Sequence, residues 1–250
     1  MKNALVLALA LALTPALVSA GAPAAHKGGI EEQGYAWHAQ EGEKIAALKL
    51  KGNVKKGKEI YEVCAACHLP SGSGRSDGTF PQLAGQYSTV IIKQIADIRA
   101  GLRDNPTMYP FAITLSDAQE LADVAAYIQT MCIPRDHGMG STAPALLKRG
   151  EALYKKECTS CHGASGEGDK ARFYPVLAGQ HYKYMLRQVT EIRDGKRNAN
   201  PDMAKIFKKY SDKDLDAVVA YMSTLTMPGA LCPEKAAGKK LSHRRIRQTE

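Results

Sequence analysis

Two short segments carry cysteine and histidine in a spacing that suits covalent attachment of a metal cofactor. They read Cys64-Ala65-Ala66-Cys67-His68 and Cys158-Thr159-Ser160-Cys161-His162. Two thiols at this spacing can each form a thioether with one vinyl group of haem, and the histidine that follows can ligate the iron. A zinc ribbon or a thioredoxin-like pair would leave both histidines unexplained. The motifs therefore predict two haem c groups, attached through Cys64, Cys67, Cys158 and Cys161, with His68 and His162 as axial ligands.

The second axial position decides whether a haem transfers electrons or reacts with small molecules. A methionine thioether closes this position and raises the reduction potential, which suits electron transfer. Met108 and Met203 are the candidates, because each follows a Gly-x-Arg segment and an Asn-Pro turn. They lie 40 and 41 residues after His68 and His162. The other methionines of the two halves have no methionine at the matching position, and we interpret them as packing or loop residues.

The chain repeats itself with an offset of 94 residues. Residues 80–86 and 174–180 share an aromatic-Pro-x-Leu-Ala-Gly-Gln pattern that begins 12 residues after each motif histidine. A duplication of this kind predicts two similar domains. Strand-like alternation is nearly absent, so we expect an all-α fold of two small tandem domains, each wrapped round one haem.

A helix is predicted to close each domain. Apolar residues recur at i, i+3, i+4 and i+7 in both halves, which is typical of the buried face of a helix. Ser116, which begins a Ser-x-x-Gln capping-box sequence, precedes the first run, and Ser211 precedes the second. The expected core positions are Leu121, Val124, Ala125 and Ile128 in the first half and Leu215, Val218, Val219 and Met222 in the second.

Residues 1–20 have the features of a secretory signal peptide. Lys2 precedes an apolar run over residues 4–13, and small residues lie before Gly21. The run is shorter than the roughly 20 residues that a membrane-spanning helix needs. We expect the exported chain in the periplasm, soluble or peripherally associated with the membrane, with no transmembrane helix after cleavage.

Composition and the repeat divide the rest of the chain. A Gly/Ala-rich N-terminal extension covers residues 21–52, and its amphipathic stretch 45–48 can pack on the first domain. The first domain spans residues 53–132 and the second spans 147–228, with a linker rich in Pro, Gly and Ser at 133–146. A basic tail covers residues 229–250.

The formal net charge of the chain is +9. This excess favours acidic protein partners or anionic surfaces, and no nucleic-acid-binding motif stands out. The charge is unevenly shared. Residues 55–123 contain seven basic and eight acidic side chains, a net charge of −1, whereas residues 148–216 contain fifteen basic and ten acidic side chains, a net charge of +5.

Cys132 and Cys232 remain after the haem motifs are assigned. Each follows the closing helix of its half, and an even pair of cysteines in an exported chain predicts a disulfide between them. Such a bond would close a loop of about 100 residues, worth up to ~4.7 kcal/mol in the chain-entropy model. Ligation of a haem by either cysteine is the alternative, although Met108 and Met203 occupy the expected positions.

These motifs resemble the dihaem cytochromes c4 over residues 53–225. The resemblance implies two class I cytochrome c domains related by pseudo-twofold symmetry, with His/Met ligation by His68 with Met108 and by His162 with Met203. It also implies that the carbonyls of Pro81 and Pro175 accept the imidazole N–H groups. Members of the family are periplasmic electron carriers that pass electrons toward terminal oxidases.

The resemblance therefore implies an electron carrier that is not an enzyme. It would connect respiratory or sulfur-oxidising redox partners with a membrane-bound terminal oxidase. The alternative is a cytochrome subunit of a redox enzyme, either a sulfide- or thiosulfate-oxidising complex or a dihaem peroxidase. A peroxidase needs an open or removable ligand at one haem, whereas matched methionines favour the carrier.

Overall fold

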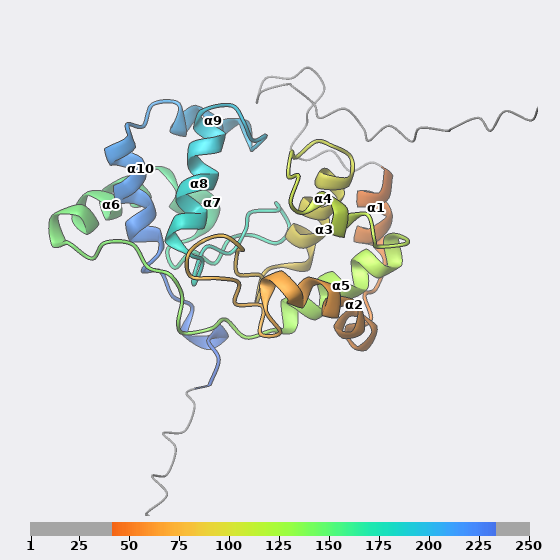
Figure 1. Cartoon of the computed structure of the whole chain (residues 1–250). Coiled ribbons are helices and arrows are strands. Elements are labelled where there is room, and N and C mark those ends of the chain that lie inside the picture. Colours follow the sequence, from red (N-terminus) through yellow and green to blue (C-terminus); the bar gives the residue numbers. More distant parts are fainter. Residues whose placement is uncertain (1–41, 234–250) are drawn as a thin grey trace, which may run out of the picture.

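A computed structural model describes residues 42–233 of the chain. The predicted signal peptide, residues 21–41 of the predicted extension and residues 234–250 of the basic tail lie outside the described residues. The described part forms two helical lobes side by side, with the first half of the chain in one and the second half in the other (Figure 1). No strand occurs within residues 42–233, and the predicted all-α fold is confirmed. None of the described helices is long and apolar enough to cross a membrane.

The first lobe is built around the crossing of two helices, α2 (Val54–His68) and α5 (Ala118–Thr130). The predicted core positions of α5 are all buried, and they pack with residues of α3 (Ser88–Arg99). The short helix α4 (Tyr109–Ala112) covers the end of α3. Helix α1 (Gly42–Lys49), from the predicted extension, packs on α3 and α5 and buries Ala47.

The second lobe repeats this arrangement. Helix α6 (Pro144–Glu157) packs on α10 (Asp212–Met222), and the four predicted core positions of α10 are buried. Helix α8 (Tyr182–Arg193) corresponds to α3, and α9 (Pro201–Phe207) corresponds to α4. The short α7 (Thr159–His162) carries the end of the second haem motif, and a 3-10 turn, η1 (Pro228–Ala230), follows α10.

Equivalent glycines allow the two main helix pairs to cross closely. A Cβ atom at Gly57 would lie 1.9 Å from the carbonyl oxygen of Asp123, and one at Gly150 would lie 2.0 Å from that of Ala217. Any side chain at these positions would therefore push the helices apart. The same crossing buries Tyr61 and Tyr154, whose rings lie against Tyr127 and Tyr221 respectively.

Gly57→Ala should lower the free energy of unfolding by about 1–3 kcal/mol, because the added methyl group overpacks a backbone contact. Denaturant unfolding of the holoprotein, followed by circular dichroism, measures this change. Gly229→Ala is the matched control, since no atom lies within 4 Å of a Cβ at that position. Its effect should stay within about 0.5 kcal/mol, and an equal loss in both variants would contradict the close-crossing explanation.

One difference between the lobes follows from one extra residue. Cys64 lies seven positions after Gly57, but Cys158 lies eight positions after Gly150. Helix α2 runs without interruption through the first motif, whereas α6 ends at Glu157 and α7 begins at Thr159. The break at Cys158 accommodates the extra residue and still brings His162 to a buried position like that of His68.

The helix caps also differ. Asp117 is the N-cap of α5 and accepts hydrogen bonds from the backbone N–H groups of Gln119 and Glu120. The prediction of Ser116 as this cap is therefore wrong by one residue. The Asp117 carboxylate accepts hydrogen bonds from two of the free donors of the first turn, and the Glu120 carboxylate accepts one from the Ser116 N–H at 2.7 Å. In α10, Ser211 is the N-cap and forms a capping box with Asp214.

The segment between the lobes is anchored at its start by a buried residue, although more than half of the segment is exposed. Residues 133–143 cross from one lobe to the other, and α6 begins at Pro144. Ile133 is buried between two equivalent glycines, because a Cβ at Gly85 or Gly179 would lie 2.8 or 2.5 Å from its side chain. The segment that we predicted as a linker therefore supplies a core residue between the domains.

Cys132 and Cys232 are bonded to each other in the structure, with Cα atoms 4.8 Å apart. Backbone hydrogen bonds of 2.8 Å on both sides of Ile133 hold the same two segments together. We predict that the denatured, unreduced holoprotein contains no free thiol, since the other four cysteines would be in thioethers. Thiol titration checks this. Two free thiols would rule out the bond, and a dimer that dissociates on reduction would indicate an intermolecular bond.

Candidate functional site

One cavity of about 1080 Å³ extends through both lobes. All ten residues that the sequence and the resemblance assign to haem attachment, axial ligation and proline support line it. They are Cys64, Cys67, His68, Pro81 and Met108 from the first lobe and Cys158, Cys161, His162, Pro175 and Met203 from the second. The cavity therefore brings together both candidate sites in one continuous space.

In the first site, His68 is held in an orientation suited to iron ligation. Its Nδ1 lies 2.9 Å from the carbonyl oxygen of Pro81, which can only accept, so Nδ1 carries the proton. Its Nε2 is buried and has no hydrogen-bond partner within the described residues. Burial lowers the pKa of His68, and the bond to Pro81 opposes this only in part. The result is a neutral imidazole with its second nitrogen available, which is what a haem iron requires.

The second site has the same construction. The Nδ1 of His162 lies 3.2 Å from the carbonyl oxygen of Pro175, and burial lowers the pKa of His162. Tyr154 donates a hydrogen bond from its hydroxyl to the Gly163 carbonyl at 2.7 Å, directly after the motif. In the first site, Tyr61 donates to the Leu69 carbonyl at 3.0 Å. Each motif is thus fixed to its domain by a buried tyrosine.

The two methionines enter the cavity from equivalent places. Met108 immediately precedes α4, and Met203 lies in α9. Asn105 accepts a hydrogen bond from the Met108 N–H at 3.1 Å, and Asn200 caps α9, so the Asn-Pro turns predicted from the sequence begin both segments. The cavity walls are otherwise mainly apolar. They include Ile91, Ile95, Leu115 and Val124 in the first lobe and Val189, Ile192, Phe207 and Met222 in the second.

The residues present therefore fit two haem groups. The cysteine thiols are the predicted attachment points, and burial raises the pKa of Cys64 to about 11 and that of Cys158 to about 12. Cys132 and Cys232 do not line the cavity. Within residues 42–233, no group of three or more His, Cys, Asp or Glu side chains is arranged to bind a metal ion.

Two glutamines join the domains in a reciprocal way. The Gln86 side chain forms two 3.0 Å hydrogen bonds with Val176, accepting from its N–H and donating to its carbonyl. The Gln180 side chain does the same with Gln82, at 3.0 and 2.9 Å. Gln86 corresponds to Gln180 and Gln82 to Val176 at the repeat offset of 94. The two domains therefore meet through the same surface used twice.

An arginine–glutamine quartet extends this symmetry into the cavity. Arg103 donates to Gln94 at 2.7 Å in its own domain and to Gln188 at 3.0 Å in the other. Arg197 donates to Gln188 at 2.6 Å and to Gln94 at 3.3 Å. All four residues line the cavity. They place two guanidinium groups where the two domains meet.

The sequence pattern did not single out the domain contacts, although a signal was present. The glutamines and arginines recur at the same positions in each half. An apolar core does not require polar side chains at these positions, so their repetition needs another explanation. Their repetition could have indicated a self-complementary interface. Tyr184 joins the arginine–glutamine network from the second domain only. Its hydroxyl accepts a hydrogen bond from Arg103 at 3.3 Å, whereas its counterpart in the first half is Val90.

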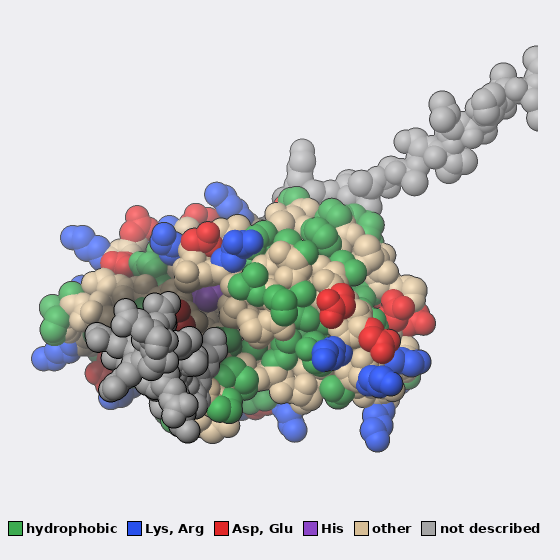
Figure 2. All heavy atoms as spheres, turned by 60° about the horizontal axis from the view of Figure 1, so that its bottom comes forward, with side chains coloured by type: hydrophobic (Ala, Val, Ile, Leu, Met, Phe, Trp, Pro, Cys, Tyr) green, Lys and Arg blue, Asp and Glu red, His purple; other side chains and the backbone are tan. Residues whose placement is uncertain are grey.

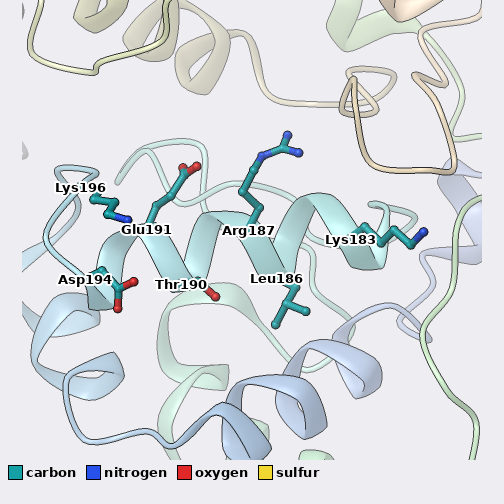
Figure 3. Close-up of a pocket in the computed structure, with 7 residues that line it drawn as sticks. All are labelled: Lys183, Leu186, Arg187, Thr190, Glu191, Asp194 and Lys196. Carbon is teal, nitrogen blue, oxygen red and sulfur yellow. The ribbon is translucent and has the colours of Figure 1, made fainter.

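A second, smaller depression of about 330 Å³ lies along α8 (Figure 3). Lys183, Arg187 and Lys196 line it together with two carboxylates, those of Glu191 and Asp194. None of its lining residues is buried. We regard it as a surface feature with mixed charge rather than a binding site.

Comparison with known proteins agrees with this geometry. The family model of cytochrome c matches residues 54–131 and 147–226. Cytochrome c4 of Azotobacter vinelandii is 34% identical over 194 residues, which cover 70% of this chain and 90% of the relative. The chain belongs to the cytochrome c4 family. The thiosulfate dehydrogenase electron acceptor of Stutzerimonas stutzeri (strain A1501) is 34% identical over 196 residues, which cover 71% of this chain and 90% of that protein.

A solved structure of a family member has the same fold as this chain. The crystal structure of reduced recombinant cytochrome c4 from Pseudomonas stutzeri superimposes with a TM-score of 0.61 and 32% identity, covering 70% of this chain and 99% of that one. As a member of this family, the chain carries two covalently bound haem c groups. It is an electron-transfer protein and not an enzyme in its own right.

Proposed function

We propose that His68 with Met108 and His162 with Met203 are the axial ligands, and that the four motif cysteines form the thioethers. Bound haem supplies a one-electron iron centre. The chain supplies what tunes it: a neutral imidazole held by a proline carbonyl, a thioether as second ligand and a largely apolar cavity. Arg103 and Arg197 add positive charge at the domain boundary, where it can offset the negative charge of haem carboxylates.

We further propose that the chain carries electrons in the periplasm, from a respiratory or sulfur-oxidising donor to a membrane-bound terminal oxidase. The continuous cavity is the observation that supports electron transfer through the chain, because both haem sites open into one space. The similarity to a thiosulfate dehydrogenase electron acceptor supports a sulfur-oxidising donor. Residues 1–20 supply the export signal, and domains 53–132 and 147–228 are the two carriers.

The two domains offer different surfaces to partners. In the first lobe, Val63, Phe111 and Ile113 are exposed large apolar residues, and two of them, Val63 and Phe111, also line the cavity. Figure 2 shows hydrophobic side chains over much of this lobe. In the second lobe, the exposed Lys205, Lys208 and Lys209 lie on or next to α9, which carries Met203. The second domain is therefore the one suited to an acidic partner, and the first meets the other redox partner.

The alternative is a cytochrome subunit that stays bound to a redox enzyme. Purification from the native host at low and at moderate salt separates the two functions. A carrier elutes without an oxidoreductase and is reduced when only a catalytic amount of the donor enzyme is added. A complex that contains an oxidoreductase and persists through moderate salt would contradict the carrier function and support the subunit function.

A further inference from the structure

His181 lies where three parts of the molecule meet. It is the N-cap residue of α8 in the second domain and is only 2% exposed. Its Nε2 lies 2.7 Å from the carbonyl oxygen of Ser73 in the first domain. Its Nδ1 accepts a hydrogen bond from the N–H of Gly138, in the segment between the domains, at 3.0 Å. One imidazole therefore joins both domains and the connecting segment.

Glycines allow these three parts to approach closely around the ring. A Cβ at Gly138 would lie 2.1 Å from the Ser76 carbonyl oxygen, and one at Gly78 would lie 2.6 Å from the backbone nitrogen of Tyr184. The carbonyl of Gly138 also accepts from the N–H of Tyr182 at 2.7 Å. The junction is thus tightly packed and leaves little room for its hydrogen bonds to rearrange.

The partners of His181 allow only one state of the ring. A backbone N–H can only donate, so Nδ1 must be the unprotonated nitrogen. A backbone carbonyl can only accept, so Nε2 must carry the proton. The imidazole is therefore neutral, with a defined tautomer. A second proton on Nδ1 would face the Gly138 N–H, donor against donor, and that hydrogen bond would be lost.

We propose that neutral His181 is a positioning residue that holds the connecting segment and the Ser73 loop against the second domain, and that protonation of its Nδ1 releases the connecting segment. The loop concerned leads back to the first haem site, because the N–H of Gly74 donates to the carbonyl of His68 at 2.9 Å. The equivalent position in the first half is Tyr87, which does not titrate near neutral pH, so the device belongs to one domain only.

The surroundings of the ring define the direction of the pH effect. His137 and Asp136 face it from the connecting segment and Asp77 from the first-domain loop, and Asp77 in turn lies near Arg75 and Lys183. Burial lowers the pKa of His181 below its ordinary value, which is about 6.5. In the closed junction, protonation of His181 is unfavourable, whereas in the opened junction the ring can take up the proton. Stability of the junction is therefore full above about pH 6.5 and falls as the pH drops below that value.

Amide exchange of the reduced, full-length holoprotein, followed by NMR, tests this proposal. The protection factor of the Gly138 N–H corrects for the intrinsic pH dependence of exchange. It should fall by about tenfold per pH unit below about pH 6.5, until the ring itself is protonated in the closed form. His181→Gln can keep both hydrogen bonds through its amide but cannot titrate, so its Gly138 protection should be high and independent of pH.

His137→Gln is the matched control, because His137 lies in the same segment and bonds the Ser223 carbonyl at 2.8 Å instead. It should keep the pH dependence of the wild-type protein. The ¹⁵N shifts of the wild-type His181 ring give a test without any variant, since they report the Nε2–H tautomer at pH 7 and its titration. A Gly138 protection factor that is level from pH 7 to pH 5 would overturn the proposal, as would the same slope in His181→Gln.

Discussion

Met108→Ala and Met203→Ala should each convert one haem, and only one, to a state without its thioether ligand. The near-infrared Met-to-iron charge-transfer band of the ferric protein should lose about half of its intensity in each single variant, since two equivalent ligands contribute to it. The potential of the affected haem should fall by on the order of 100 mV or more, because axial ligands move haem potentials over a range of about 0.8 V. Covalent attachment should persist, since the thioethers do not depend on the sixth ligand.

Met139→Ala is the control for this experiment. Met139 is 50% exposed and does not line the cavity, so its removal should change neither the band nor the potentials. An unchanged spectrum in Met203→Ala would transfer the ligand role to Met185 or Met222, the other two methionines of the second lobe that line the cavity. A high-spin haem or rapid peroxide turnover in the wild-type protein would favour the peroxidase alternative.

Reversal of charge at Lys205, Lys208 and Lys209 should slow electron transfer to an acidic acceptor by about tenfold or more at low salt. These three side chains are exposed beside the second haem site, and long-range fields change association rates by 10- to 1000-fold. The wild-type rate should itself fall as salt is added, since the Debye length is about 10 Å at 0.1 M ionic strength. Stopped-flow kinetics over a salt series measure both effects.

Lys55, Lys56 and Lys58 provide the matched cluster. They are also exposed and also number three, but they lie at the start of α2 in the first domain, whose net charge is −1 against +5 for the second. Reversal there should have a clearly smaller effect on the same step. Equal effects from the two clusters, or no salt dependence, would remove the assignment of partners to domains and leave the carrier function in place.

Local sequence patterns predicted the cysteines, histidines and methionines that line the cavity. The spacing of the motif brings cysteine and histidine to one cavity because it lies within about a turn of helix. Helical periodicity predicted the buried faces of α5 and α10, since one side of each must pack on its partner helix. The role of the proline carbonyls was implied by the resemblance rather than by any pattern in the residues. Both carbonyl oxygens lie within 3.2 Å of the histidine Nδ1 atoms.

Contacts between distant segments could not be predicted in this way. Lys44 of α1 reaches the carboxylate of Asp97 at 2.7 Å, where Lys93 also binds, and all three side chains are buried. No periodicity relates residue 44 to residue 97. The His181 junction likewise depends on two backbone groups that any sequence would supply, together with glycines whose close approach appears only in three dimensions.

The reciprocal pairing of Gln86 and Gln180 also limits how many domains can join through this surface. The glutamine side chain of each domain bonds the backbone of the other, so the hydrogen-bonding groups of this contact are paired within the molecule. A self-complementary contact of this kind closes on itself after two copies and cannot extend into a row. A further copy of the domain would therefore have to join through a different surface. The protein is therefore a closed pair of domains, and with one haem c in each domain it can hold two electrons at a time.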